Sequence, residues 1–392
     1  MRDRKTLVLA LSAALALALA LAACGGGSSS TSGGTTSEST GTATGEGSTT
    51  EDVSSGAASK EAKALLAPYI GHPSPFPVTE KLKEVPKGAT IAYMDCGTPV
   101  CALFWQLIGP AAQTMGVTIE HVKAGAAANT VSAAFDSVVA KKPDAVISVG
   151  IDIELWQKQL KELDEMGIPV VTSGSTEAEQ YEGITGVQAA DSQAKVWSEL
   201  LAAYIADEMS EEANVAFYYV PELPFERIMS EEFPQDLEAM CPGCTSHASP
   251  IQLTTIGNTA PNTIVSDLQA NPETTIAVFA GDEIETGLPA ALQSAGIEVE
   301  TLGNIPTPTN LQYVKEGKET ATLGYDVPVW SWMMLDMAAK GIVGQELTGP
   351  EGEGLVDLQF LTQKDIKFDP TKGWTGYPDF AERFAKLWGV GG

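Results

Sequence analysis

Four cysteines in the body of this chain stand in two close pairs and are its most reactive side chains. The first pair is Cys96 and Cys101, and the second is Cys241 and Cys244, which are separated by only two residues. Cysteines at such spacings can form a disulfide, exchange electrons with another thiol, or bind a metal ion. A metal would need two further ligands, and His247 is the only histidine near the second pair. Four cysteines allow three pairings, so the spacing alone leaves these roles open.

Motifs that are typical of enzymes are missing from the sequence. The globular part has no G-x-S-x-G elbow, no H-E-x-x-H, no P-loop and no G-x-G-x-x-G. Adjacent acidic residues such as Glu231 and Glu232 occur, but in so acidic a chain they most often mark solvated faces. No nucleophile stands with a base. We therefore expect a protein that is not an enzyme and that has no cofactor and no metal.

The residues after Gly88 alternate between short apolar runs and amphipathic stretches. Runs rich in Val and Ile predict buried strands, and the stretches between them have the length of helices. The predicted strands are 89–94, 117–122, 145–149, 168–172, 214–220, 245–249, 276–280, 298–302 and 320–325. The predicted helices are 103–115, 130–141, 153–166, one from about 191, one that includes 234–240, 263–270, 287–295, 309–316 and 330–340. This alternation indicates parallel sheets with helices on both faces, and its restart after residue 188 indicates two α/β lobes.

Polar and aromatic residues near the ends of these strands form the candidate binding site. Ligands of open α/β sheets bind beyond the carboxyl ends of the strands. The candidates that this rule selects are Asp95, Phe104, Trp105, Asp152, Ser173, Arg227, Asp282, Asn304, Tyr325 and Asp326, and Tyr219, Glu222 and Phe225 also follow a strand. Aromatic faces beside hydrogen-bonding groups suit a small polar ligand with an apolar face.

Each candidate also has a structural interpretation. Trp105 can pack in the core, and either Asp95 or Asp152 can cap a helix. Arg227 can pair with a neighbouring glutamate, Glu222 or Glu226. The residue types alone do not choose between these interpretations and a role in the site.

Four groups of residues, taken in order, resemble a known family. They are 142–148 with 163–171, 277–283 with 287–292, 314–323, and 384–388. These segments resemble the type I periplasmic binding proteins, specifically the sugar-binding group that includes ribose-binding proteins. The resemblance implies two Rossmann-like lobes that are joined by three hinge strands and close on a ligand. It implies crossings near 188–191, 325–327 and 352–357, so that 88–189 with 327–352 form the first lobe and 190–326 with 353–392 the second.

The sugar-contacting pattern of that family is only partly present. Arg227 lies where sugar-binding members carry a ligand arginine, and Tyr325 lies near their hinge glutamine. Gly281 replaces the usual ligand asparagine, Ser173 begins the segment that replaces an Asp-Arg pair, and Asn304 stands where an aspartate is usual. The resemblance therefore implies a sugar or sugar-like polar ligand, but not a simple pentose or hexose.

The N-terminus resembles a bacterial lipoprotein signal. Residues 1–23 have a basic start and an apolar core, and they end in Leu-Ala-Ala before Cys24. The resemblance implies that Cys24 carries the lipid and becomes the mature N-terminus. Residues 24–58 are mostly Gly, Ser and Thr and predict a flexible tether. Because export favours disulfides, we predict the pairs Cys96–Cys101 and Cys241–Cys244.

The charge of the chain limits its partners. Its 23 Lys and Arg face 51 Asp and Glu, a formal net charge of −28, which disfavours nucleic acid. We expect a monomeric, membrane-anchored extracytoplasmic lipoprotein that captures a small ligand and delivers it to an ABC permease. The alternatives are a receptor that presents its ligand to a sensor kinase and an exported thiol-disulfide protein that uses Cys241 and Cys244.

Overall fold

The computed structural model describes residues 60–189 and 191–391. The predicted signal sequence, the lipidated Cys24 and the tether up to residue 58 lie outside the described residues. Within the described part of the chain, no helix combines the length and the apolar character needed to cross a membrane.

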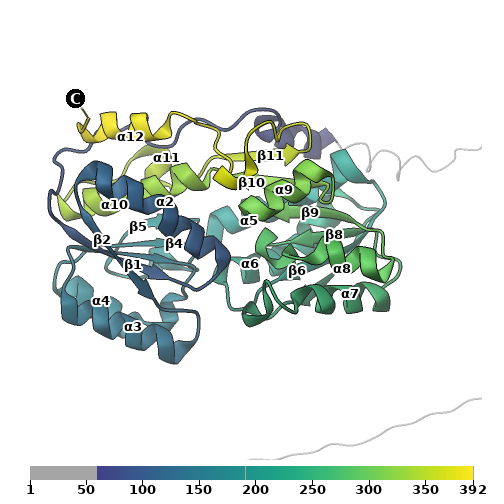
Figure 1. Cartoon of the computed structure of the whole chain (residues 1–392), viewed down its shortest axis with the longest axis horizontal. Helices are drawn as coiled ribbons and strands as arrows, with labels where there is room; N and C mark the ends of the chain where they lie inside the picture. The colour runs from purple at the N-terminus through teal and green to yellow at the C-terminus, as the bar shows by residue number, and fades with distance from the viewer. Residues whose placement is uncertain (1–59, 190, 392) are drawn as a thin grey trace, which may run out of the picture. The chain divides into compact units, whose positions relative to one another are not determined.

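The first lobe is built on a five-stranded parallel sheet with the order β2-β1-β3-β4-β5 (Figure 1). Its strands are β1 (Thr90–Asp95), β2 (Thr118–Lys123), β3 (Ala145–Val149), β4 (Val170–Ser173) and β5 (Ile184–Gln188). The helices between them are α2 (Pro99–Met115), α3 (Ala128–Lys141), η2 (Ile153–Leu155), α4 (Gln157–Glu165) and η3 (Ala178–Gln180). Every residue of β3 is buried, as expected for a central strand with helices on both faces.

The second lobe is built on a six-stranded sheet with the order β11-β10-β9-β8-β6-β7, in which only β10 and β11 pair antiparallel. Its strands are β6 (Asn214–Tyr219), β7 (Thr245–Pro250), β8 (Ile276–Phe279), β9 (Glu300–Asn304), β10 (Ala321–Tyr325) and β11 (Leu358–Thr362). Its helices are α5 (Asp191–Tyr204), η4 (Ile205–Met209), α6 (Pro224–Met240), η5 (Leu253–Thr255), α7 (Ala260–Ala270), η6 (Asp282–Glu285), α8 (Leu288–Ala295), α9 (Pro308–Glu316) and η7 (Pro370–Lys372).

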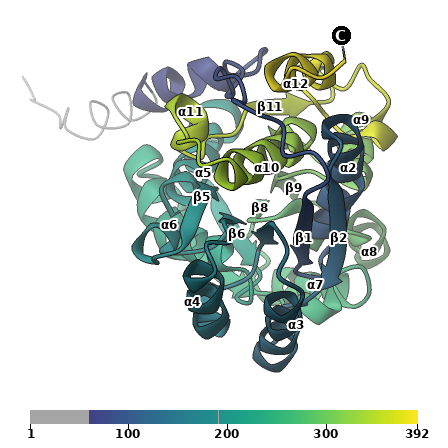
Figure 2. The same ribbon diagram turned by 90° about the vertical axis from the view of Figure 1, so that its left-hand side faces the viewer.

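Helix α10 (Val327–Ile342) brings the chain back to the first lobe, where it packs on α2 and on β3, β4 and β5. Residues 327–340 are all buried, because α10 lies between the first sheet and the C-terminal helix α12 (Phe380–Trp388). Figures 1 and 2 both show α12 above α10. The sequence analysis placed 353–392 in the second lobe, whereas α12 packs on α10 and α2 of the first lobe through stacked Trp332 and Trp388.

Among the described residues, the chain passes between the lobes at five places. The first passage runs from η1 (Ala67–Tyr69) and Ile70, which pairs with Phe360 of β11, to β1, and along it the Leu82 N–H donates to the Leu387 carbonyl of α12. The other passages are β5 to α5, β10 to α10, α11 (Gly349–Gly352) to β11, and the segment before α12. We call residues 188, 189, 191, 325–327, 353–357 and 375–376 the hinge band. Its backbone is internally bonded: the Ala189 N–H donates to the Gly354 carbonyl at 3.3 Å, and the Asp326 N–H donates to the Asp357 carbonyl at 3.1 Å. The Asp326 carboxylate also accepts from the Gly376 N–H at 2.8 Å.

Several elements differ from the sequence expectation. Helix α2 begins at Pro99 rather than at 103, because Thr98 caps it by accepting from the Cys101 N–H. The expected helix 153–166 is divided into η2 and α4 at Trp156, whose backbone is not helical. Strands β5 and β11 were not expected from periodicity, since each is short and follows a loop with turn residues.

Candidate functional site

A pocket lies between the two lobes, and its cavity volume is about 40 Å³ in this conformation. From the first lobe it is lined by Cys96, Thr98, Val100, Cys101, Phe104, Val149, Gly150, Ser173, Gly174 and Trp330. From the second it is lined by Trp197, Leu223, Phe225, Glu226, Gly281, Glu283 and Ile305. Most of these residues follow the carboxyl ends of strands, which is where open α/β sheets place their ligands.

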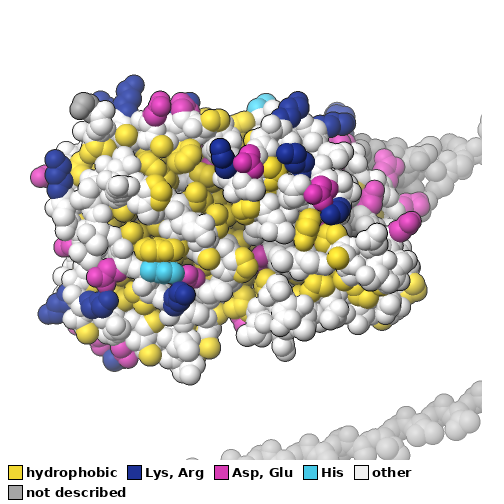
Figure 3. Space-filling model, in the orientation of Figure 1, with side chains coloured by type: hydrophobic (Ala, Val, Ile, Leu, Met, Phe, Trp, Pro, Cys, Tyr) yellow, Lys and Arg dark blue, Asp and Glu magenta, His cyan; other side chains and the backbone are white. Residues whose placement is uncertain are grey.

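Aromatic side chains form the walls of the pocket. The Phe104 and Trp330 rings meet edge to face with centroids 4.6 Å apart, and Trp197 and Phe225 do so at 5.7 Å. Tyr325 lies behind the walls, 4.7 Å from Trp197 and 5.4 Å from Trp330. Figure 3 shows hydrophobic side chains gathered over α2 and α10, the helices that carry Phe104 and Trp330. Because packing fixes these rings, the walls are rigid apolar surfaces.

Two buried glutamates supply the ionisable groups of the pocket. Glu226 accepts from the Val220 N–H at 2.5 Å, and its other carboxylate oxygen has no partner. Glu283 accepts from the Val100 N–H at 2.9 Å. Burial raises the pKa of Glu226 well above its ordinary value and raises the pKa of Glu283 to about 7. Neither carboxyl is paired with a cationic side chain among the described residues.

Contacts between the lobes hold this conformation closed. The Arg227 guanidinium forms an ion pair with Asp152 across the two lobes at 2.6 Å, rather than with Glu222 or Glu226. The Val100–Glu283 hydrogen bond also joins the lobes. Gly174 allows the close approach, because a Cβ added to it would lie 3.3 Å from the Phe225 ring.

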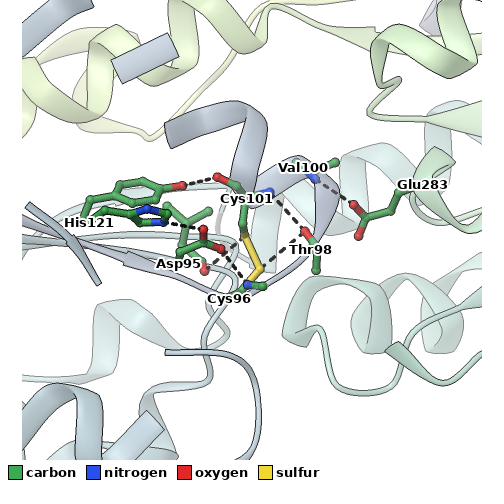
Figure 4. The surroundings of a disulfide bond; sticks show 10 residues. Asp95, Cys96, Thr98, Val100, Cys101, His121 and Glu283 are labelled. Carbon is green, nitrogen blue, oxygen red and sulfur yellow. Dashed lines mark hydrogen bonds and ion pairs between the residues drawn. A yellow bond between two sulfur atoms is a disulfide. The ribbon is translucent and has the colours of Figure 1, made fainter. Parts of the chain in front are cut away.

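The disulfide Cys96–Cys101 ties the end of β1 to the first turn of α2 at the edge of the pocket (Figure 4). Beside it, Asp95 accepts from His121 Nε2 at 2.7 Å, and the Trp105 ring stacks on His121 with centroids 4.3 Å apart. Asp95 and Trp105 therefore support the loop from behind and do not line the pocket. The carboxylate and the two sulfurs lie close enough to share an ion, but the disulfide leaves no thiolate to bind one.

Asp282 and Asn304 hold strands of the second sheet together. Asp282 accepts from the Asn304 N–H at 2.5 Å and from the Thr322 hydroxyl at 2.7 Å. The Asn304 side chain donates to a backbone carbonyl just after β8. Glu285 and Glu319 are buried beside Asp282, and burial raises the pKa of all three carboxyls. Neither Asp282 nor Asn304 lines the pocket, although both follow strands that end at it.

The predicted residues thus divide into three groups. Phe104, Ser173 and Phe225 line the pocket, and Asp152 and Arg227 join the lobes beside it. Tyr325 supports the aromatic walls, and Asp326 caps α10 by accepting from the Val329 N–H at 3.0 Å. The remaining candidates do not line the pocket and instead support the elements around it: Asp95, Trp105, Asp282 and Asn304.

Most pocket residues were not among the sequence candidates, and four of these are aromatic or acidic: Trp197, Glu226, Glu283 and Trp330. Trp330 lies five residues after β10, and Glu283 stands next to Asp282, so the strand-end rule reaches both. Glu226 was considered only as a partner of Arg227. Trp197 lies inside α5, well beyond the end of β5, so the strand-end rule does not select it.

The second disulfide, Cys241–Cys244, joins the end of α6 to the start of β7. Cys241 is buried and its sulfur lies 3.3 Å from the Glu211 carbonyl. Neither cysteine lines the pocket, so this disulfide belongs to the framework of the second lobe.

Comparison with known proteins gives one family. Residues 92–346 match the sequence profile of the periplasmic binding protein domain. No curated protein sequence matches the chain significantly.

Solved structures with the same fold cover most of the described residues. An ABC transporter periplasmic solute binding protein from Actinobacillus succinogenes with bound D-allose is 20% identical, with a TM-score of 0.61, and the match covers 72% of this chain and 99% of that one. A 5-methylthioribose transporter solute binding protein from Thermotoga lettingae, in complex with 5-methylthioribose, is 17% identical, with a TM-score of 0.66 and coverages of 79% and 99%. A solute binding protein from Agrobacterium vitis with bound allitol is 17% identical, with a TM-score of 0.61 and coverages of 71% and 97%. The predicted two-lobed α/β fold is confirmed.

Proposed function

Because the chain belongs to the periplasmic binding protein family, we propose that it is the extracytoplasmic ligand receptor of an ABC importer. It captures a small polar ligand between its lobes and delivers it to a membrane permease. The observation that carries this proposal is the pocket itself, which both lobes line at the ends of their strands and which contacts between the lobes close. The proteins of similar fold that hold allitol, D-allose and 5-methylthioribose support a sugar-like ligand.

The proposal includes a lipid anchor on Cys24 and a tether up to about residue 58, which would keep the two lobes near the membrane that holds the permease. It also includes a hinge made of the passages between the lobes. The hydrogen bonds within the hinge band support this role. They join the passages to one another and leave the two sheets free to rotate relative to each other. In this mechanism the ligand shifts the population toward the closed form, because it contacts both lobes only there.

The function is tested by a thermal-shift screen of the full chain against sugars, polyols, nucleosides, amino acids and aromatic acids, followed by X-ray scattering. A ligand at 100 times its dissociation constant should stabilise the chain by about 2.7 kcal/mol. The ligand found in this way should also reduce the radius of gyration. A ligand that binds in the pocket with no compaction would contradict the hinge mechanism.

Replacing Arg227 by alanine should weaken binding of that ligand by roughly fivefold, because the lost ion pair with Asp152 stabilises only the closed form. Scattering of the ligand-free variant should show a larger radius of gyration. Asp152→Asn should have the same effect, and the double variant should bind the ligand no more weakly than either single variant.

Lys195→Ala is the matched control, because Lys195 pairs with Glu232 at 2.6 Å within the second lobe. If Arg227 instead contacts the ligand, its effect will persist in the Asp152→Asn background.

The two disulfides make a second matched pair. Cys96→Ser with Cys101→Ser should lower the free energy of unfolding by about 2 kcal/mol, the loop-closure value for so short a loop. It should also weaken ligand binding by roughly tenfold, because the loop that lines the pocket must then be ordered on binding. Cys241→Ser with Cys244→Ser should lower stability to a similar extent and leave affinity unchanged. Chemical denaturation and calorimetric titration measure the two effects, and equal affinity losses in both variants would refute this role of the first disulfide.

A further inference from the structure

The ionisable side chains that line the pocket are all acidic. Glu226 and Glu283 are its ionisable residues, and the described residues that line it include no lysine, arginine or histidine. Arg227, the nearest arginine in sequence, is already committed to Asp152 and to the Pro221 carbonyl. The two carboxyls of the pocket are therefore either protonated or negatively charged, and no cationic side chain that lines the pocket balances the charged form.

The two glutamates are built into the pocket and are not part of an exposed acidic face. Glu226 is 0% exposed and Glu283 is 2% exposed. One buried Glu226 oxygen has no hydrogen-bond partner among the described residues. A Cβ added to Gly281 would lie 2.8 Å from it, so a glycine at 281 leaves room for this oxygen. Because an unpaired buried carboxylate is costly, an ion pair with a bound ligand would stabilise its charged form.

The aromatic walls favour the same type of ligand. Trp197, Trp330, Phe104 and Phe225 surround the pocket from both lobes. Aromatic faces attract ammonium groups, and tryptophan attracts them most strongly. The indole N–H groups of Trp197 and Trp330 and the Ser173 hydroxyl are buried without partners, so they remain available to hydroxyl oxygens of a ligand.

We propose that the pocket selects a small hydroxylated organic cation, whose ammonium group lies against the aromatic walls and pairs with Glu226 and Glu283. This inference rests on the proposed function, since it specifies the ligand of the same pocket. It differs from an uncharged sugar in requiring one positive charge. A neutral sugar would stack on the same rings and hydrogen-bond to the same carboxyls, but it would offer no counterion to their charged forms.

The test uses two pairs of probes that differ in charge: choline with 3,3-dimethyl-1-butanol, and D-glucosamine with D-glucose. Calorimetric titration of the full chain should show binding of a cationic probe at least tenfold tighter than that of its neutral partner. Equal or tighter binding of the neutral partner, or no binding of either cationic probe, would overturn the inference. If neutral sugars bind and compact the chain, the proposed function stands while the charge requirement fails.

Variants of the two glutamates separate charge from shape. Glu226→Gln and Glu283→Gln keep the size of each side chain, and each should weaken binding of the cationic probe at least tenfold. Glu222→Gln is the matched control, because Glu222 is exposed near Glu226 and does not line the pocket. A thermal melt of each ligand-free variant checks that it folds. If both pocket variants bind the cationic probe as tightly as the unchanged chain does, neither glutamate contacts the ligand and the inference is wrong.

Discussion

Replacing Lys340 by methionine should lower the free energy of unfolding by about 3–5 kcal/mol, the loss expected when one partner is removed from a buried ion pair. Lys340 is 0% exposed, and its ammonium lies 2.7 Å from Asp336 and also contacts Glu351. Methionine fills a similar volume, so most of the loss arises because the Asp336 charge is left in the interior without a counterion. Urea denaturation of the ligand-free chain measures the effect.

Glu351→Gln is the matched control for this prediction. Burial and the nearby Asp336 raise the pKa of Glu351 to about 9, so its carboxyl is mostly protonated at neutral pH. Glutamine keeps the shape and the absence of charge, and the loss should stay below about 1 kcal/mol. If Glu351→Gln destabilises the chain as much as Lys340→Met does, the charge assignment within this cluster is wrong.

The ligand-free chain should become less stable as the pH rises from 5 to 8. Burial raises the pKa of Glu226, of Asp282 with its neighbours Glu285 and Glu319, and, to about 8, of Asp357. An acid with a raised folded-state pKa keeps its proton in the folded chain at a pH where the unfolded chain has lost it. The folded state then binds more protons, so its stability is complete below about pH 4 and falls as the pH rises towards the folded pKa.

The size of this fall is set by the number of buried acids. Each unit of pKa difference corresponds to about 1.4 kcal/mol, so several groups together should lower the free energy of unfolding by more than about 3 kcal/mol between pH 5 and pH 8. Glu319→Gln should flatten the pH profile, whereas Glu298→Gln, at an exposed position, should leave its slope nearly unchanged. Denaturation curves at several pH values provide the measurement, and a profile that is level or rises with pH would show that these carboxyls are ionised in the folded chain.

The fold was predictable because its signals are local. A run such as 145–149 is apolar throughout and is followed by a stretch of helix length, and each such unit specifies a strand and its covering helix. The restart of the pattern after residue 188 then indicates the second sheet. The position of α12 was not predictable in this way, because its strongly apolar side fits either lobe and only its contacts with Trp332 and Asp336 decide.

The site was predictable only in outline. The strand-end rule places a residue near the right edge of a sheet, and this was enough for Phe104 and Ser173. It does not give the direction of the side chain. Asp282 follows the correct strand but turns to Thr322 and to the backbone of Asn304, while the next residue, Glu283, lines the pocket.

The hinge band limits how the two lobes can move. Among the described residues, five segments of backbone join the lobes, and hydrogen bonds link four of them to one another through Ala189, Asp326 and Asp357. Sliding one lobe past the other would extend several of these backbone segments at once. Rotation of the lobes about an axis through the hinge band changes only a few backbone dihedral angles. In the proposed hinge mechanism, the relative motion of the lobes would then be reduced to nearly one degree of freedom. A single angle then sets the separation of Trp197 from Trp330 and of Val100 from Glu283, so the walls of the pocket come together in concert rather than one at a time.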